Sequence, residues 1–334
     1  MRLFPGRLGR RRQRPFNPDR QPEPLRRSRW VSPSLLVQAV PEQLSALLAL
    51  MPPPASAPPP RITHFVNLYP PPEGDMTQAH TIASMRRAAA AHDGPVRLLC
   101  IQHRDDPDQT PEGFARGPDL SRNVLDIAPL VPPRPLPLLF DILESGAADA
   151  ADDGFLVFTN ADICLQPHFY TAVSALLARG FEALVINRRT VGAALAEDPA
   201  APLLAAETGD VHPGFDCFVF RARLARNFLR NDACIGMRAV SLGLLYNLIA
   251  HAPRMAILTN ATLTYHFGDD ARWDDSRFAA YTRHNQAAAL QTARALLLAG
   301  SREAERLMAY CRHCYAPPYV RTLLHELFGA QARL

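Results

Sequence analysis

Short apolar runs alternate with segments of helical periodicity through the first two thirds of the chain. Four runs predict strands: ITHFVNLY (62–69), VRLLCIQH (96–103), GFLVFT (154–159) and EALVINRR (182–189). Three intervening segments repeat apolar residues at helical spacing: 76–92, 136–146 and 167–180. GFLVFT lacks polar alternation, as expected for a strand of a parallel sheet that is covered on both faces. This order predicts an α/β fold with an open, doubly wound, mostly parallel sheet.

The rest of the chain divides around this region. CFVFRARL, MAILTN and ATLTYHF predict further strands, and the chain reads as helices from Asp274 onwards. MPPPASAPPP has the composition of a polyproline-type linker, and a short helix is expected to begin near Pro41. We therefore expect three parts: a basic, proline-rich arm and linker with that helix (1–60), an α/β domain (61–275) and a helical C-terminal extension (276–334).

Charge is concentrated at the N-terminus. Residues 1–30 hold ten arginines against Asp19 and Glu23, whereas the whole chain carries a net charge of only +4 and has no lysine. The remaining body is thus mildly acidic, which argues against nucleic acid as a partner. Several interpretations of the arm stay open: weak association with an anionic membrane surface or another polyanion, a transit peptide, or a solvated flexible tail without a partner.

Neither apolar runs nor cysteines suggest a membrane or secreted protein. No apolar run approaches the roughly 20 residues that cross a bilayer. The six cysteines are scattered, several in apolar strand-like runs, which suits reduced thiols in a cytoplasmic protein. The Cys311–Cys314 pair has metal-ligand spacing, but no second pair of ligands follows at comparable spacing, so we interpret it as incidental.

A polar pair ends the most apolar predicted strand. Asn160 and Asp162 follow GFLVFT at the carboxyl end of the strand, where ligands bind in open α/β sheets. Extended residues two positions apart point the same way, so both oxygens would face a hard divalent cation, Mn²⁺ or Mg²⁺. Ordinary turn or cap residues are the alternative reading of this tripeptide.

Other polar residues also fall at predicted strand ends. Asp216 precedes CFVFRARL, close to Gly214, and His266 follows another apolar run with Asp269 and Asp270 shortly after it. His266 could be a metal ligand or a hydrogen-bonded histidine at the edge of the core.

Further polar residues lie near predicted strand ends, and the two arginines among them could contact a phosphate. They are Arg188 and Arg189 at the end of one strand, Asn67 near the end of the first, and Asp105 after the second. An exposed strand end or a polar loop explains each of them equally well.

Together these motifs resemble the GT-A glycosyltransferase superfamily, over roughly residues 62–275. Asn160-Ala161-Asp162 matches the strand-terminal D-x-D motif that holds the metal on the donor diphosphate, with Asn in place of the first Asp. The resemblance implies a GT-A-like nucleotide-sugar-binding domain, His266 as a third metal ligand and Asp216 as the acceptor-side base, with Asp269 and Asp270 as rivals.

For Asn67 and Asp105 the resemblance implies contacts to the base and ribose of the donor. The expected activity is metal-dependent transfer of a sugar from a nucleoside-diphosphate donor to a glycan or other hydroxyl acceptor. Two alternatives remain: an inactive nucleotide- or glycan-binding module, and another phosphate-handling α/β enzyme. The chain lacks the phosphate-loop pattern G-x-x-x-x-G-K-[ST] and the dinucleotide pattern G-x-G-x-x-G.

Overall fold

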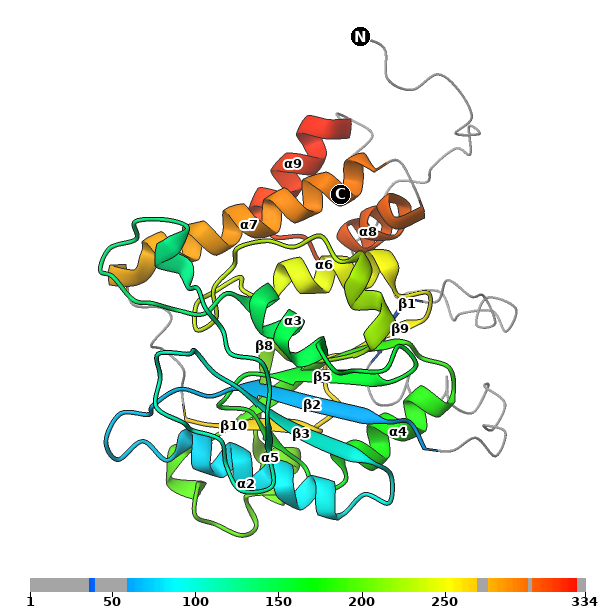
Figure 1. The fold of residues 1–334 in the computed structure, drawn as a ribbon. Coiled ribbons are helices and arrows are strands. Elements are labelled where there is room, and N and C mark those ends of the chain that lie inside the picture. The colour runs from blue at the N-terminus through cyan, green and yellow to red at the C-terminus, as the bar shows by residue number, and fades with distance from the viewer. Residues whose placement is uncertain (1–35, 40–58, 269–275, 300–301, 329–334) are drawn as a thin grey trace.

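The computed structural model describes residues 36–39, 59–268, 276–299 and 302–328 (Figure 1). Its strands are β1 (Leu36–Ala39), β2 (Ile62–Asn67), β3 (Val96–Ile101), β4 (Ala115–Arg116), β5 (Phe155–Thr159), β6 (Cys164–Leu165), β7 (Ala183–Val191), β8 (Asp210–Arg221), β9 (Met255–Leu258) and β10 (Thr264–Phe267). Its α-helices are α2 (Thr77–Ala90), α3 (Leu139–Ala147), α4 (Phe169–Ala178), α5 (Ala201–Thr208), α6 (Leu242–His251), α7 (Ala279–Leu298), α8 (Arg302–His313) and α9 (Pro318–Phe328).

One mixed sheet organises these elements, in the order β1-β9-β7-β8-β5-β2-β3-β4. Only β8 runs antiparallel to its neighbours on this path, β5 and β7; the other pairings are parallel. β10 lies off the path, parallel to the end of β7 and antiparallel to β6. The predicted α/β class with a mostly parallel sheet is confirmed.

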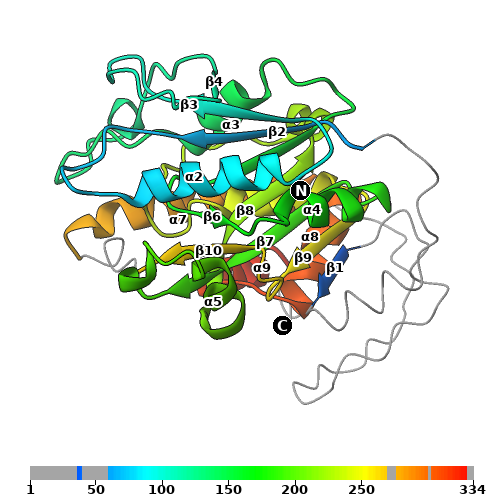
Figure 2. The same cartoon turned by 90° about the horizontal axis from the view of Figure 1, so that it is seen from below.

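Each face of the sheet carries its own apolar core. Helices α2 and α4 cover one face, against side chains such as Val66 and Val157 (Figure 2). Helices α3 and α6 cover the other, against Phe65, Phe158 and Phe218. Because both faces are covered, β5 is buried at every position and apolar at all but Thr159, which agrees with the absence of polar alternation in the sequence.

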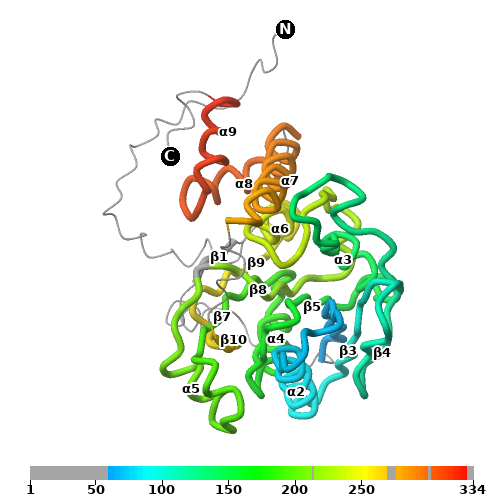
Figure 3. The backbone as a smooth tube through the Cα atoms, turned by 90° about the vertical axis from the view of Figure 1, so that its left-hand side faces the viewer, coloured from blue at the N-terminus to red at the C-terminus, as the bar shows by residue number. Residues whose placement is uncertain are grey.

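The C-terminal helices belong to the second of these cores. Leu296 of α7, Leu307 of α8 and Leu324 of α9 join the same buried cluster as the residues of α6 (Figure 3). The helical extension expected from Asp274 onwards therefore packs onto the α/β domain through α6, a helix that the sequence pattern did not single out.

Residues within the expected arm contribute to the sheet. Leu36–Ala39 form β1, which pairs in parallel register with Met255–Leu258 of β9. These four residues of the expected arm therefore belong to the sheet of the α/β domain. Residues 1–30 and the helix expected near Pro41 lie outside the described residues.

Among the described residues, none of the helices combines the length and the hydrophobicity that a membrane-spanning helix requires.

The cysteines form no disulfide bond. All six cysteines are free, and Cys311 and Cys314 form no disulfide; Cys314 is exposed while the other five are buried.

Candidate functional site

The chain turns immediately after β5. β5 ends at Thr159, and the carbonyl of Asn160 accepts a hydrogen bond of 3.2 Å from the amide of Ile163, which closes a turn. The side chains of Asn160 and Asp162 consequently reach different neighbours, Asp216 and His266 respectively. A turn at Asn160 therefore replaces the extended i, i+2 arrangement that the pattern suggested, and both residues lie at the end of β5.

Asp162 and His266 face one another. His266 Nε2 lies 3.6 Å from Asp162 Oδ2, and the side chain of His266 is 6% exposed against 35% for Asp162. The other ring nitrogen, Nδ1, lies 3.1 Å from the carbonyl oxygen of Gly268, which can only accept a hydrogen bond. In the neutral ring, Nδ1 therefore carries the proton and Nε2 presents its lone pair towards the carboxylate.

Such a pair of facing acceptors suits a cation. Asp162 Oδ1 is also buried and has no hydrogen-bond partner in the described part of the chain. Within that same part, no group of three or more His, Cys, Asp or Glu side chains could hold a metal by itself. The facing pair fits a divalent cation that takes one carboxylate and one imidazole from these residues and further ligands from water and phosphate.

Nearby cysteines do not compete for this role. Burial raises the pKa of the Cys164 thiol, two residues after Asp162, to about 12. Burial also raises the pKa of Cys217, next to Asp216. Both remain neutral thiols at physiological pH, whereas metal binding and nucleophilic attack require the thiolate.

Asp216 lies inside β8 rather than before it. The predicted strand began at Cys217, but β8 starts at Asp210, and its register with β7 shifts on either side of Asn187. The segment HPGFD (212–216) is thus part of β8 and lies at this irregularity in its pairing with β7.

Neighbours engage both carboxylate oxygens of Asp216. Oδ1 lies 3.4 Å from the amide nitrogen of Asn160. Oδ2 lies 3.6 Å from a guanidinium nitrogen of Arg188 and 3.6 Å from Nδ1 of His212. The side chains of Arg188 and Asp216 are 4% and 14% exposed, so this is a largely buried ion pair.

His212 was not among the candidates from the sequence. Its Nδ1 accepts a hydrogen bond of 3.0 Å from the amide of Gly214, so the proton of the neutral ring resides on Nε2. Its spacing from Asp216 could have identified it. The two residues are four positions apart, and an extended strand puts such residues on the same face.

Arg188 and Arg189 point to opposite sides of β7, as consecutive strand residues do. Arg188 reaches Asp216, whereas Arg189 donates to the carbonyl of Gly209 and to Oδ1 of Asn260. Only Arg188 therefore lies with the candidate catalytic carboxylate.

The candidate nucleotide contacts lie at the ends of β2 and β3. Asn67 is buried, its amide donates to the carbonyl of Ile101 at 3.0 Å, and its Oδ1 is without a hydrogen-bond partner among the described residues. Asp105, in the loop after β3, is exposed and lies 3.4 Å from Nδ1 of His103. Asp269 and Asp270 lie outside the described residues.

A buried histidine braces the strand that leads into the site. His64 of β2 is fully buried; its Nε2 lies 2.9 Å from the hydroxyl of Thr159, and its Nδ1 lies 2.7 Å from the hydroxyl of Tyr170 on α4. Burial lowers the pKa of His64 to about 3, so the ring is neutral. This contact ties the last residue of β5 to α4 just before the turn that carries Asn160 and Asp162.

Comparisons with known proteins add structural likenesses of low identity. No family model and no curated protein sequence matches the chain. A mannosyltransferase from Pyrobaculum calidifontis, solved with GDP-mannose and Mn²⁺, is similar over 86% of this chain and 86% of its own, at 13% identity and a TM-score of 0.43.

Two further solved structures are similar over 68% of this chain. The catalytic domain of Drosophila β-1,4-galactosyltransferase 7, in complex with xylobiose, is covered over 79% of its length at 9% identity and a TM-score of 0.38. A 4-diphosphocytidyl-2C-methyl-D-erythritol synthase from Anaerococcus prevotii is covered over 96% of its length at 8% identity and a TM-score of 0.37.

Proposed function

We propose that this protein transfers a sugar from a nucleoside-diphosphate donor to an acceptor hydroxyl, with Mn²⁺ or Mg²⁺ bound at the end of β5. The observation that carries the proposal is the facing pair Asp162–His266, in which a carboxylate oxygen and an imidazole nitrogen lie 3.6 Å apart at the end of β5. A carboxylate oxygen and an imidazole nitrogen are ligand types that Mn²⁺ takes in proteins, and both lie where a donor diphosphate would bind in an open α/β sheet. The proposal rests on these residues and on the GT-A resemblance, since all the structural likenesses reported have TM-scores below 0.5.

Asp162, His266 and the amide oxygen of Asn160 would hold the metal. When bound, it offsets the negative charge that develops on the leaving diphosphate. Gly268 fixes the orientation of His266 through its carbonyl, and it adopts a positive φ of 81°, which favours glycine. The turn after β5 carries Asp162, whose carboxylate faces the imidazole of His266.

Asp216 would accept the proton of the acceptor hydroxyl. Its carboxylate is partly exposed and is held by Asn160 and Arg188, so its orientation is fixed before a substrate arrives. Of the two candidate arginines, Arg188 lies beside Asp216 and would contact a donor phosphate there. Asn67 and Asp105, at the ends of β2 and β3, would contact the base and ribose.

A second candidate function is binding of a nucleotide sugar without catalysis. The observation that favours it is that neighbouring side chains already engage both oxygens of Asp216. A proton acceptor in this position would have to exchange one of these contacts for the acceptor hydroxyl.

One experiment separates these functions. Thermal unfolding is followed with a panel of nucleoside-diphosphate sugars, with and without Mn²⁺, and release of the nucleoside diphosphate is then measured for every stabilising donor. A donor that stabilises the protein only with Mn²⁺, and that releases its nucleotide in the presence of acceptors, supports transfer. Stabilisation without release supports the binding module, and no stabilisation by any donor contradicts both.

A further inference from the structure

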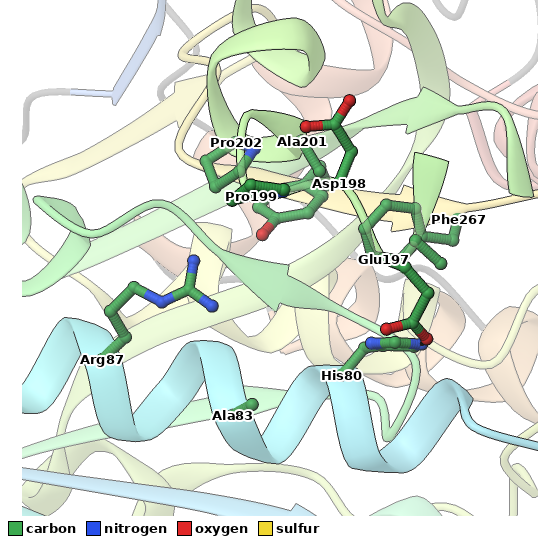
Figure 4. A pocket seen from close by; sticks show the side chains of 11 residues that line it. His80, Ala83, Arg87, Glu197, Asp198, Pro199, Ala201, Pro202 and Phe267 are labelled. Carbon is green, nitrogen blue, oxygen red and sulfur yellow. The ribbon is translucent and has the colours of Figure 1, made fainter. Parts of the chain in front are cut away.

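A pocket lies on the other side of β10 from His266. Its volume is about 200 Å³, and it opens between α2, β10 and the segment 196–202 (Figure 4). Tyr265 and Phe267 of β10 line it, while His266 between them faces Asp162. Because neighbouring strand residues point to opposite faces, the strand itself separates this pocket from the proposed metal site.

Arg87 of α2 supplies hydrogen-bond donors to the pocket. In Figure 4 its side chain extends from α2 towards the side where Pro199 and Pro202 lie. Among the residues that the structure describes, its guanidinium makes no hydrogen bond or ion pair. Burial raises the pKa of Tyr265 and the charge of Arg87 lowers it, which agrees with their sharing one cavity.

Glu197 supplies the acceptors. Its side chain is 84% exposed, and its carboxylate lies 3.5 Å from Nε2 of His80 on α2. The neighbouring Asp198 is less available, because its carboxylate accepts a hydrogen bond of 2.7 Å from the amide of Ala200 in the turn before α5. The guanidinium of Arg87 on α2 therefore offers donors, and the carboxylate of Glu197 on the segment 196–202 offers acceptors, from opposite walls of the pocket.

Apolar side chains complete the lining. They are Ala83, Ala196, Pro199, Ala201, Pro202 and Phe267. The ring of Phe267 packs edge-on against His80, with ring centroids 5.5 Å apart, so it is held in position.

We propose that this pocket binds one neutral sugar ring of a glycan. A sugar offers hydroxyls that both donate and accept, and C–H faces that pack on apolar and aromatic surfaces, which matches this mixture of groups. A phosphate would gain from Arg87 but would be repelled by Glu197 and Asp198. The volume is below the roughly 300 Å³ at which pockets for drug-sized ligands begin, so it suits a single ring rather than a nucleotide sugar.

The site goes beyond the proposed transfer reaction. A ring bound here is separated by β10 from the Asp162–His266 pair, so it would be a remote unit of a glycan rather than the sugar that is transferred. Glycan binding at this pocket therefore does not require the metal or the catalytic residues.

Ligand-observed NMR with simple probes tests the proposal. Methyl α-mannoside, methyl β-galactoside and methyl β-glucoside are titrated into the full chain, with inorganic phosphate as the competing anion. At least one hexoside should bind, and R87A and E197Q should each weaken it about tenfold or more, while phosphate should not displace it. R86A is the matched control: Arg86 is the exposed neighbour on α2 whose guanidinium donates to the carbonyl of Glu112.

The outcomes also separate this site from the proposed reaction. Asp162→Ala should bind the hexoside as the unmodified protein does, even though it loses transfer. Absence of binding by all three hexosides overturns the proposal, as does displacement by phosphate or equal weakening by R86A and R87A. Loss of hexoside binding in Asp162→Ala would place the sugar in the metal site instead.

Discussion

The imidazole of His266 and the carboxylate of Asp162 lie 3.6 Å apart although the residues are far apart in the chain. The short ladder between β6 and β10 explains the encounter, because Cys164 pairs with Tyr265 and Leu165 pairs with Thr264 in antiparallel register. Asp162 just before β6 and His266 just after Tyr265 are thereby carried to the same end of that ladder. β10 in turn is fixed by parallel pairing with the end of β7.

Removing either member of this pair should weaken metal binding. We expect Asp162→Ala to abolish transfer and to lower the affinity for Mn²⁺ by at least about tenfold, because it removes the carboxylate of the site. His266→Ala should reduce activity and raise the Mn²⁺ concentration that is required. Calorimetric Mn²⁺ titration in the presence of a nucleoside diphosphate measures the affinity without relying on turnover.

The control for the metal prediction is Asp153→Ala. Asp153 is an exposed carboxylate paired with Arg61 on the surface, and its removal should leave Mn²⁺ affinity and turnover unchanged. Normal turnover of Asp162→Ala with its donor would show that the metal site has been placed wrongly.

Asp216→Asn should separate the transfer enzyme from the binding module. The change keeps the size of the side chain but removes its basicity, so donor binding should survive while turnover falls by about 10²–10⁴-fold. Single-turnover release of the nucleoside diphosphate at saturating donor gives this ratio. Unimpaired turnover would exclude Asp216 as the base and direct attention to Asp269 and Asp270.

The Arg188–Asp216 ion pair should couple the two residues in stability. Arg188→Met leaves a largely buried carboxylate without its guanidinium, so we expect a loss of about 3 kcal/mol in the free energy of unfolding. In an Asp216→Asn background the same substitution should cost clearly less, because the partner is already neutral. A double-mutant cycle by urea unfolding measures the difference, and strict additivity would show that the pair contributes no coupling.

His64 should make the protein sensitive to acid. Its pKa in the folded protein is about 3, below the ordinary value of 6.5, so the unfolded chain binds its proton first as the pH falls. The stabilisation is complete above pH 6.5 and is lost progressively between pH 6.5 and 3, at about 1.4 kcal/mol per pH unit.

Replacing His64 tests this dependence. His64→Gln keeps hydrogen-bonding capacity but does not titrate, so its free energy of unfolding should fall less between pH 7 and 5 than that of the unmodified protein. Chemical unfolding at the two pH values measures both. Equal losses in the two proteins would mean that other groups determine the acid sensitivity.

Two truncations should separate the arm from the sheet. Deletion of residues 1–35 keeps β1, and we expect the unfolding midpoint to stay nearly unchanged. Deletion of residues 1–58 removes β1 and leaves one edge of β9 unpaired, while the other edge stays paired with β7, so it should cost about 1–3 kcal/mol. The comparison uses thermal and urea unfolding, and equal stability of the two truncated proteins would contradict a structural role for Leu36–Ala39.

Local pattern determined the class of fold and the sequence positions of most of its core elements. The strands near 62, 96, 155 and 183 and the helices between them were predictable, because strands covered on both faces are rich in apolar residues without alternation and a surface helix keeps one apolar stripe. The same reasoning placed Asn160, Asp162 and His266 at strand ends, since polar residues are tolerated where a buried strand leaves the core. β1 was not predicted, because an edge strand of four residues has too few positions to show a periodic pattern.

Which of those polar residues meet was decided only by the tertiary structure. The pairing of β10 with β6 and β7 brings His266 to Asp162, and the irregularity between β7 and β8 sets Asp216 beside Arg188 and His212. Periodicity reports which face of a strand a residue occupies, but strand order and register depend on contacts between segments distant in the chain. The physical reason is that packing and long-range hydrogen bonding, which no local window contains, fix how strands align.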